Sequence, residues 1–149
     1  MTRSKFRQQV FLAKDVTNSL AAIPPQDNDG TLINGIAIDR RGAASALVAF
    51  ASAAASGAPD TAVALITVEH CDVTTAGSFV AFKTLSAALN VDPTGQDVEY
   101  MVDVSGAKRY IRVSCDITYT GGTTPKNLVC AQVVLGDYDV EPKIAQTVL

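Results

Sequence analysis

Hydrophobic and polar side chains alternate most regularly in two stretches of the second half of the chain. The residues of one parity in these stretches are Val98, Tyr100, Val102 and Val104, then Ile111, Val113, Cys115 and Ile117. A period of two is typical of a β-strand that buries one face. The sequence therefore predicts two strands that point these residues into a core. A compact loop at Ser105-Gly106-Ala107 separates the two strands, so they are expected to form a hairpin.

The chain between residues 31 and 135 repeats this pattern in shorter pieces, which turn residues interrupt. Further strands are expected at residues 31–39, 44–55, 62–70, 78–82 and 128–135. The alanines of 44–55 suit a helix by propensity, but the neighbouring segments are strands, and this context favours a strand. A helical turn is expected at 84–89 and a β-turn at 92–95. About eight strands without a clear helix predict an all-β, antiparallel β-sandwich that is jelly-roll-like.

The first 30 residues differ from the rest and predict an N-terminal extended arm. Pro24-Pro25 and the turn-rich residues 26–30 form a strong breaker. We therefore divide the chain into an arm and linker at 1–30, a β-sandwich domain at 31–142 and a C-terminal tail at 143–149. A chain of 149 residues is long enough for one domain with a real core.

Cationic and apolar side chains are mixed within the arm. The candidate contact residues are Lys5, Phe6, Arg7, Val10 and Phe11. Such a segment folds poorly alone but can order against a partner, and it loses conformational entropy as it does so. We expect residues 1–23 to contact another subunit. The alternative is a disordered tail, which is common at chain termini.

The distribution of charge argues against nucleic acid and membranes as partners. The net charge is −3, and the cations are scattered apart from the pairs Arg40-Arg41 and Lys108-Arg109. Nucleic-acid binding needs a concentrated basic face. The most apolar run, residues 43–55, is shorter than the roughly 20 residues that cross a bilayer. Because the N-terminus also has no apolar run of signal-peptide length, we expect a soluble, non-secreted protein.

The three cysteines are Cys71, Cys115 and Cys130, and their spacing contains no CxxC motif. An odd and sparse set of this kind argues against a disulfide framework and against a zinc site. We expect three reduced, small, buried side chains in a reducing compartment. Asp27 and Asp29 lack the pattern of an EF-hand calcium loop, so no metal and no cofactor are expected.

Candidate catalytic residues are few. The single histidine, His70, lies between Glu69 and Cys71, but neighbours in a strand point to opposite faces. Glu99 and Asp103 share a strand face at a separation of about 13 Å, too far for a glycosidase pair. The sequence contains no GxSxG, GxGxxG or GxxxxGK[ST] motif. We therefore expect that the protein is not an enzyme.

Several segments resemble, in their order and spacing, a family of small tailed-bacteriophage virion proteins known as capsid decoration, cement or head-stabilising proteins. These segments are residues 38–42 with Ser45, 64–69, 77–79, 108–113 and 133–136, and the likeness covers residues 30–142. The chain departs from the family pattern at residues 69–72, where the family is more acidic, and in the alanine-rich strand at 51–55. The resemblance implies a sandwich without catalytic residues that is assembled in the host cytoplasm.

The resemblance implies that the protein binds the lattice of the phage major capsid protein and stabilises the head. The protein would lie on the capsid surface of the virion as a small homo-oligomer, such as a trimer. The alternative is another virion component: a neck or tail part, or a receptor-binding or carbohydrate-binding sandwich. A small hydrolase is a third reading. A carbohydrate binder normally exposes aromatic rings, whereas this chain has no Trp and four Tyr.

Overall fold

The computed structural model describes residues 21–138. The predicted arm contacts Lys5, Phe6, Arg7, Val10 and Phe11 lie outside the described residues, as does the tail at 143–149. The strands of the described range are β1 (Ala21–Asn28), β2 (Ile33–Asn34), β3 (Ile38–Asp39), β4 (Ala43–Ser52), β5 (Thr61–Cys71), β6 (Val80–Asn90), β7 (Gln96–Asp103), β8 (Tyr110–Thr120) and β9 (Asn127–Tyr138). One short 3-10 helix spans Ala76–Ser78, and no helix within 21–138 is long and apolar enough to cross a membrane.

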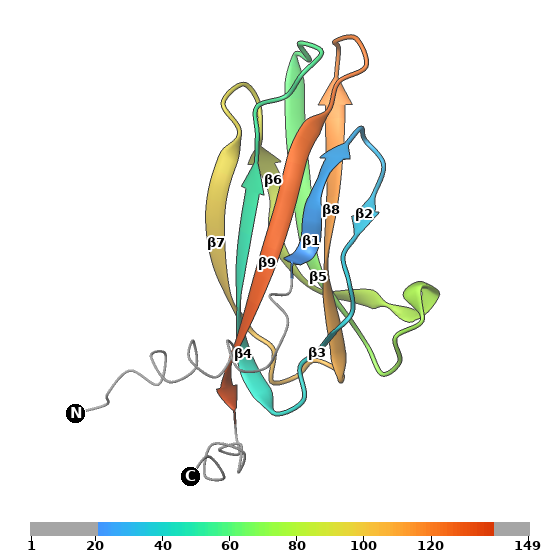
Figure 1. Ribbon diagram of the computed structural model, residues 1–149, viewed down its shortest axis with the longest axis vertical. Helices are drawn as coiled ribbons and strands as arrows, with labels where there is room; N and C mark the ends of the chain where they lie inside the picture. The colour runs from blue at the N-terminus through green and yellow to red at the C-terminus, as the bar shows by residue number, and fades with distance from the viewer. Residues whose placement is uncertain (1–20, 139–149) are drawn as a thin grey trace, which may run out of the picture.

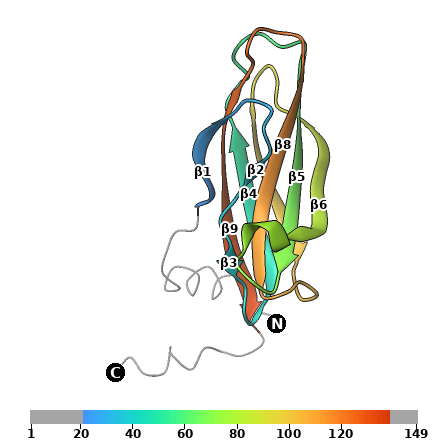
Figure 2. The same ribbon diagram turned by 90° about the vertical axis from the view of Figure 1, so that its right-hand side faces the viewer.

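The strands form two antiparallel sheets that pack face to face. Sheet A has the order β1-β9-β4-β7, and sheet B has the order β2-β8-β5-β6 with β3 also paired to β8. Sheet A faces the viewer in Figure 1, and Figure 2 shows the two sheets edge-on. When β2 and β3 are taken as one interrupted strand, only β5 and β6 are consecutive strands within one sheet. This eight-stranded, double-sheet arrangement is a jelly roll, which confirms the predicted fold class.

The inner faces of the two sheets form the core, as the alternation predicted. Ile111, Val113, Cys115 and Ile117 of β8 are buried, as is Val102 of β7. Val98 and Tyr100 are half-buried and pack against this cluster. The inward residues of both stretches thus belong to the core, as predicted, although the outward residues Arg112 and Ser114 of β8 are buried as well.

The predicted hairpin between β7 and β8 is wrong. β7 pairs with β4 in sheet A, whereas β8 pairs with β5 in sheet B, so the loop at 104–109 passes from one sheet to the other. The amides of Val104 and Ala107 close this loop by donating to the carbonyls of Ala44 and Val104. Alternation identifies the buried face of a strand, but the inner faces of both sheets give the same pattern.

The segment 31–39 is interrupted at Gly35, where the chain lies between the two sheets. The Gly35 amide donates to the Val113 carbonyl, and the next amide, of Ile36, donates to the Ala22 carbonyl. A Cβ atom on Gly35 would lie 2.3 Å from the Ala22 oxygen and 2.6 Å from the Val113 oxygen. Only glycine permits this approach, which divides one predicted strand into β2 and β3.

Three further expectations differ from the structure. Residues 84–89 are part of the continuous strand β6 and form no helical turn, because cross-strand pairing to β5 overrides local propensity. Strand β9 continues past residue 135 to Tyr138. Residues 21–28, which the sequence analysis placed in the arm and linker, form β1 on the edge of sheet A.

Strand β1 tolerates Pro24 and Pro25 because it pairs on one side only. Its register to β9 shifts between Ala21 and Ile23 and again between Ile23 and Gln26. Proline is compatible with edge strands and bulges, where no amide is required. Ala22 and Ile23 are fully buried, so this edge strand contributes to the core.

A buried polar network closes the core at the end of the sandwich opposite the β3–β4 loop. The Tyr119 hydroxyl lies 2.7 Å from the Asn28 carbonyl oxygen and 2.9 Å from Asn127 Oδ1. Asn127 Nδ2 donates to the carbonyls of Ala53 and Val91 at 2.8 and 3.2 Å. These bonds tie β1, β8 and β9 to the loops that follow β4 and β6. Burial raises the pKa of Tyr119 to about 12.

Candidate functional site

His70 has a packing role in the structure. Its ring stacks at a tilt on Phe82 with 4.9 Å between centroids, and its Nδ1 accepts a hydrogen bond of 3.2 Å from the Lys108 amide. Glu69 pairs with Arg112 on the opposite face of β5. Within residues 21–138, no group of three or more His, Cys, Asp or Glu side chains could hold a metal ion.

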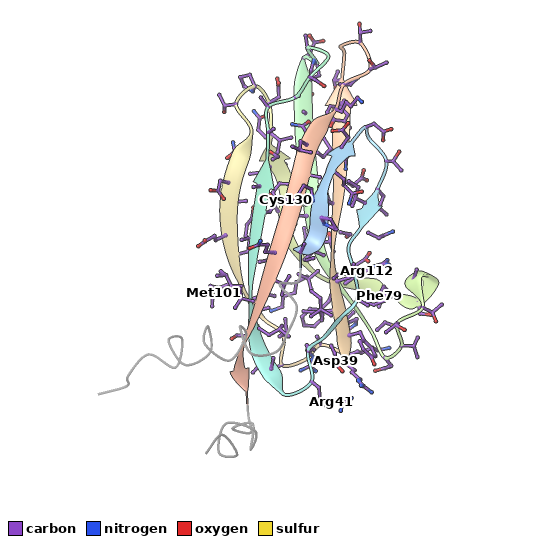
Figure 3. The ribbon with its side chains drawn as sticks, viewed as in Figure 1. Asp39, Arg41, Phe79, Met101, Arg112 and Cys130 are labelled. Atoms are coloured by element: carbon purple, nitrogen blue, oxygen red, sulfur yellow. The ribbon has the colours of Figure 1, made fainter. Side chains whose placement is uncertain are left out.

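The three cysteines are free thiols in different surroundings. Cys71 and Cys115 are buried, and desolvation, with a smaller effect of the Asp116 carboxylate, raises the pKa of Cys115 to about 12. Cys130 is only half-buried, so the expectation of three buried thiols is wrong at this position. It lies at an outward position of β9 (Figure 3) because Val129 and Ala131 take the inward positions.

The two cation pairs of the sequence meet at one end of the sandwich, which we call the charged end (Arg40, Arg41, Lys108 and Arg109). The loops that carry them are β3–β4 and β7–β8. Arg109 Nε and Nη2 donate to Asp39 Oδ2 at 3.2 and 3.0 Å, and Arg41 Nη2 lies 3.6 Å from the same oxygen. Figure 3 shows Asp39 and Arg41 together at this end.

Arg40 holds the two loops of the charged end together. Its Nε donates to the Lys108 carbonyl at 2.8 Å and its Nη1 to the Ala43 carbonyl at 2.9 Å. Its Nη2 donates to the Ala107 carbonyl. Lys108 forms an ion pair of 3.2 Å with Asp72. Arg40 thus has a structural role. The other three cations form ion pairs at the surface with Asp39 or Asp72.

Arg112 points away from the core, as the alternation predicted, but its side chain is nevertheless buried. Its side chain is 8% exposed, and its Nε lies 2.5 Å from Glu69 Oε2. Its Nη1 donates to the Ala76 carbonyl at 3.1 Å, and its guanidinium lies 4.5 Å from the centroid of the Phe79 ring. Figure 3 shows Arg112 and Phe79 at the base of the β5–β6 loop. The loop folds back over this part of sheet B, an outcome that no local pattern indicates.

The β5–β6 loop, residues 72–79, projects from the side of the sandwich (Figures 1 and 2). The contacts of Arg112 fix its middle and its end, and the ion pair of Asp72 with Lys108 fixes its start. Val73 within the loop is 49% exposed, and Val80 directly after it is 54% exposed. The structure thus presents one exposed apolar side chain on the anchored loop and a second one, Val80, at the start of β6.

The outer face of sheet A carries an apolar row. Leu47 of β4 pairs with Met101 of β7 on one side and with Val134 of β9 on the other. Met101 is 62% exposed, whereas Leu47 and Val134 are half-buried. The adjacent outward positions carry the small residues Ala49, Ala51 and Cys130 and the exposed polar residue Gln132. This row and its neighbours form a largely apolar strip, which we call the sheet A face.

Carboxylates line one margin of the sheet A face. Asp97, Glu99 and Asp103 occupy the outward, exposed positions of β7 on either side of Met101. Hydrogen bonds from Ser105 hold the pKa of Asp103 below its ordinary value. None of the outward positions of β4, β7 and β9 between residues 45 and 136 carries a cation. The sequence showed Glu99 and Asp103 on one face, and the structure adds the apolar row beside them.

No protein-family model matches the sequence, and no curated protein matches it. Solved structures do match. The VP2 protein of infectious bursal disease virus in T=1 particles (D431N mutant) superposes with a TM-score of 0.55 at 12% identity, covering 79% of this chain and 31% of that chain. VP2 in the T13 particle of the same virus gives a TM-score of 0.52 at 13% identity, covering 78% and 30%.

The chain spans less than a third of the length of these viral proteins. A carbohydrate-binding module of family CBM4 also matches, with a TM-score of 0.47 at 11% identity over 70% of this chain and 60% of that chain. At these identities the similarity concerns the fold alone. The described residues therefore share the β-sandwich fold of a protein found in icosahedral virus particles.

Proposed function

We propose that the protein is a virion structural component, and specifically a capsid decoration protein that binds the major capsid protein lattice of a bacteriophage head. The observation that carries this proposal is the jelly-roll fold of the chain, which superposes on VP2 of infectious bursal disease virus particles with a TM-score of 0.55. The family resemblance of residues 30–142 supports the narrower assignment to tailed phages. In this proposal the protein stabilises the shell by contact and carries out no reaction.

The anchored β5–β6 loop supports a role in contact. A projection whose shape is fixed before binding loses little conformational entropy when it docks. Val73 and Val80 would supply apolar contact area to a capsid subunit. In the proposal, the arm residues Lys5, Phe6, Arg7, Val10 and Phe11 contact a capsid subunit or a neighbouring copy.

Repetition would strengthen such contacts. We propose a small homo-oligomer, such as a trimer over a local threefold axis of the shell, in which weak contacts reinforce one another through effective concentration. Its location would be the outer surface of the virion, after assembly in the host cytoplasm. The free thiols of Cys71, Cys115 and Cys130 are compatible with a reducing compartment.

The first experiment mixes the purified protein with undecorated phage heads and measures occupancy by pelleting and electron microscopy. The double variant Val73→Asp/Val80→Asp should reduce occupancy, because it places charges in the proposed apolar contact. Leu32→Asp is the matched control, since Leu32 is equally exposed at 49% but lies in the β1–β2 loop. Equal occupancy for the loop variant and the control would remove the loop from the contact.

The second experiment deletes the arm. The deletion should cover residues 2–20 and stop before Ala22 and Ile23, which are fully buried in the core. We expect lower occupancy for the shortened chain, and unchanged occupancy would exclude the arm from binding. If the intact protein bound no head at all, the decoration proposal would be wrong and a neck or tail component would become the better assignment.

A further inference from the structure

We propose that, in the free protein before it meets a capsid, the sheet A face is the docking surface for the N-terminal segment, residues 1–20, of the same chain; the segment would leave this face when it contacts a capsid subunit or a neighbouring copy. The face combines an apolar row with a one-sided margin of carboxylates. Exposed apolar strips of this kind commonly mark sites of contact. Three observations indicate this particular occupant: the composition of the segment, the point where it joins the fold, and its length.

The composition of residues 1–20 complements the face. The segment carries four cations, Arg3, Lys5, Arg7 and Lys14, against the single carboxylate Asp15. Its larger apolar side chains are Met1, Phe6, Val10, Phe11, Leu12, Val16 and Leu20. The face offers the opposite charge at Asp97, Glu99 and Asp103 and apolar contacts at Leu47, Met101 and Val134. Opposite charges beside an apolar strip favour one orientation of a bound segment and disfavour others.

The point of attachment lies on the same sheet. Ala21, the first described residue, pairs with Gln132 of β9, and Gln132 pairs in turn with Ala49 of β4. Ala49 pairs with Glu99 on β7, so a single row leads from the start of β1 to the acidic margin. Adjacent strands lie about 4.8 Å apart, which places the margin about 14 Å from Ala21 across the sheet.

The length of the segment allows this path. Twenty residues can span up to roughly 66 Å when fully extended, several times the distance to the margin. Attachment through a chain of this length raises the local concentration of the segment at the face to the order of millimolar. For the same contacts to form between two separate molecules, the protein itself would have to be present at about millimolar concentration. This is why we assign the docking to the segment of the same chain.

Cys130 provides a direct probe of this docking in the isolated protein. Its half-buried thiol lies on the sheet A face, while Cys71 and Cys115 are buried and serve as internal references. We expect N-ethylmaleimide to modify Cys130 several-fold faster after deletion of residues 2–20 than in the full chain. Equal rates in the two proteins would overturn the proposal.

A variant that keeps the segment separates docking from any effect of the deletion itself. Glu99→Lys, in the full chain, should raise the modification rate of Cys130 toward that of the shortened chain. Asp116→Lys is the matched charge reversal on the outer face of sheet B and should leave the rate unchanged. An effect of Asp116→Lys equal to that of Glu99→Lys would contradict the docking surface.

Cross-linking decides which copy supplies the segment. A zero-length carbodiimide should join Lys5 or Lys14 to Asp97, Glu99 or Asp103 within one chain. In a mixture of unlabelled and ¹⁵N-labelled protein, cross-linked peptides should therefore carry a single isotope. Mixed-isotope peptides alone would show that a second copy occupies the face and would overturn the same-chain assignment. None of these measurements uses a capsid, so a negative result leaves the proposed decoration function to its own test.

Discussion

The guanidinium of Arg112 lies between the carboxylate of Glu69 and the ring of Phe79, on the side of β8 that faces away from the core. Both members of this ion pair are largely withdrawn from water, with side-chain exposures of 8% and 16%. The pair joins β5 to β8 and, through the Ala76 carbonyl, holds the β5–β6 loop against sheet B. One side chain therefore connects the β5–β6 loop to the outer face of sheet B.

Removal of Arg112 should destabilise the protein. Arg112→Met leaves Glu69 buried without its partner, and we expect a loss of about 3–5 kcal/mol in the free energy of unfolding. The double variant Arg112→Met/Glu69→Leu should recover much of this loss, because no uncompensated charge remains. Urea denaturation measures both values. Equal losses for the single and double variants would show that the stability comes from packing on Phe79 and not from the charge pair.

A charge at an inward position of β8 should be strongly destabilising. Val113→Asp buries an unpaired carboxylate in the core, and we expect a cost of several kcal/mol, about 3–5, in the free energy of unfolding. Thr118→Asp places the same side chain at an exposed, outward position of the same strand. Thermal and urea unfolding should show a small change for this control. Similar losses for the two variants would contradict the assignment of the inner face.

The three thiols should react in the order of their exposure. Because the pKa of Cys115 is raised to about 12, only about one thiol in ten thousand is ionised at pH 8. Alkylation of the folded protein should therefore modify Cys130 first and reach Cys71 and Cys115 only on unfolding. Mass spectrometry under non-reducing conditions should find all three cysteines reduced. Modification of Cys115 as fast as Cys130 in native protein would contradict its burial.

Tyr119 should make stability depend on pH in the alkaline range. Its pKa in the folded protein, about 12, lies above the ordinary value of 10 because burial disfavours the phenolate. The raised value stabilises the fold fully below pH 10, and this contribution is lost as the pH rises from 10 to 12. Tyr119→Phe should weaken the network with Asn28 and Asn127 by about 1–3 kcal/mol at neutral pH.

The same variant should show a smaller fall in stability between pH 10 and pH 12 than the unchanged protein. Tyr110→Phe is a suitable control, because this half-buried tyrosine lies at the opposite end of β8. Denaturation curves at pH 7, 10 and 11.5 would test both statements. If the free energy of unfolding fell equally between pH 10 and pH 12 in the Tyr119 variant and in the unchanged protein, ionisation of Tyr119 would not be the cause of the alkaline loss of stability.

The sequence predicts the arrangement of the sheet A face in part, but it does not predict the charged end. Glu99 and Asp103 are on one face by parity alone, and the structure agrees. Arg40 and Arg109 come together in the charged end because two loops far apart in the chain meet there. Arg40 donates to the carbonyl of Lys108, 68 residues further along the chain. No spacing within either pair of cations indicates that the two pairs meet.

The local pattern of side chains determined the strands and the residues that they bury. Ile111 and Val113 lie on the same face of the strand because side chains alternate between its two faces. Packing that face against the core removes both side chains from water. This alternation depends only on the local sequence of β8 and not on its pairing partners. The all-β class and the core residues could therefore be predicted from the sequence. The same reasoning holds for Val102 of β7.

The tertiary structure alone decided which sheet each strand joins and which outward residues become covered. β7 and β8 present the same alternation in either sheet, so the crossing at residues 104–109 depends on pairing with β4 and β5, strands distant in the chain. Arg112 is buried because a loop that begins after β5 folds back over it. The local sequence predicts a break at Pro24 and Pro25, yet both residues lie in the edge strand β1, which pairs with β9. In each case the deciding contact joins residues far apart in sequence, and the free energy of that contact outweighs the local preference.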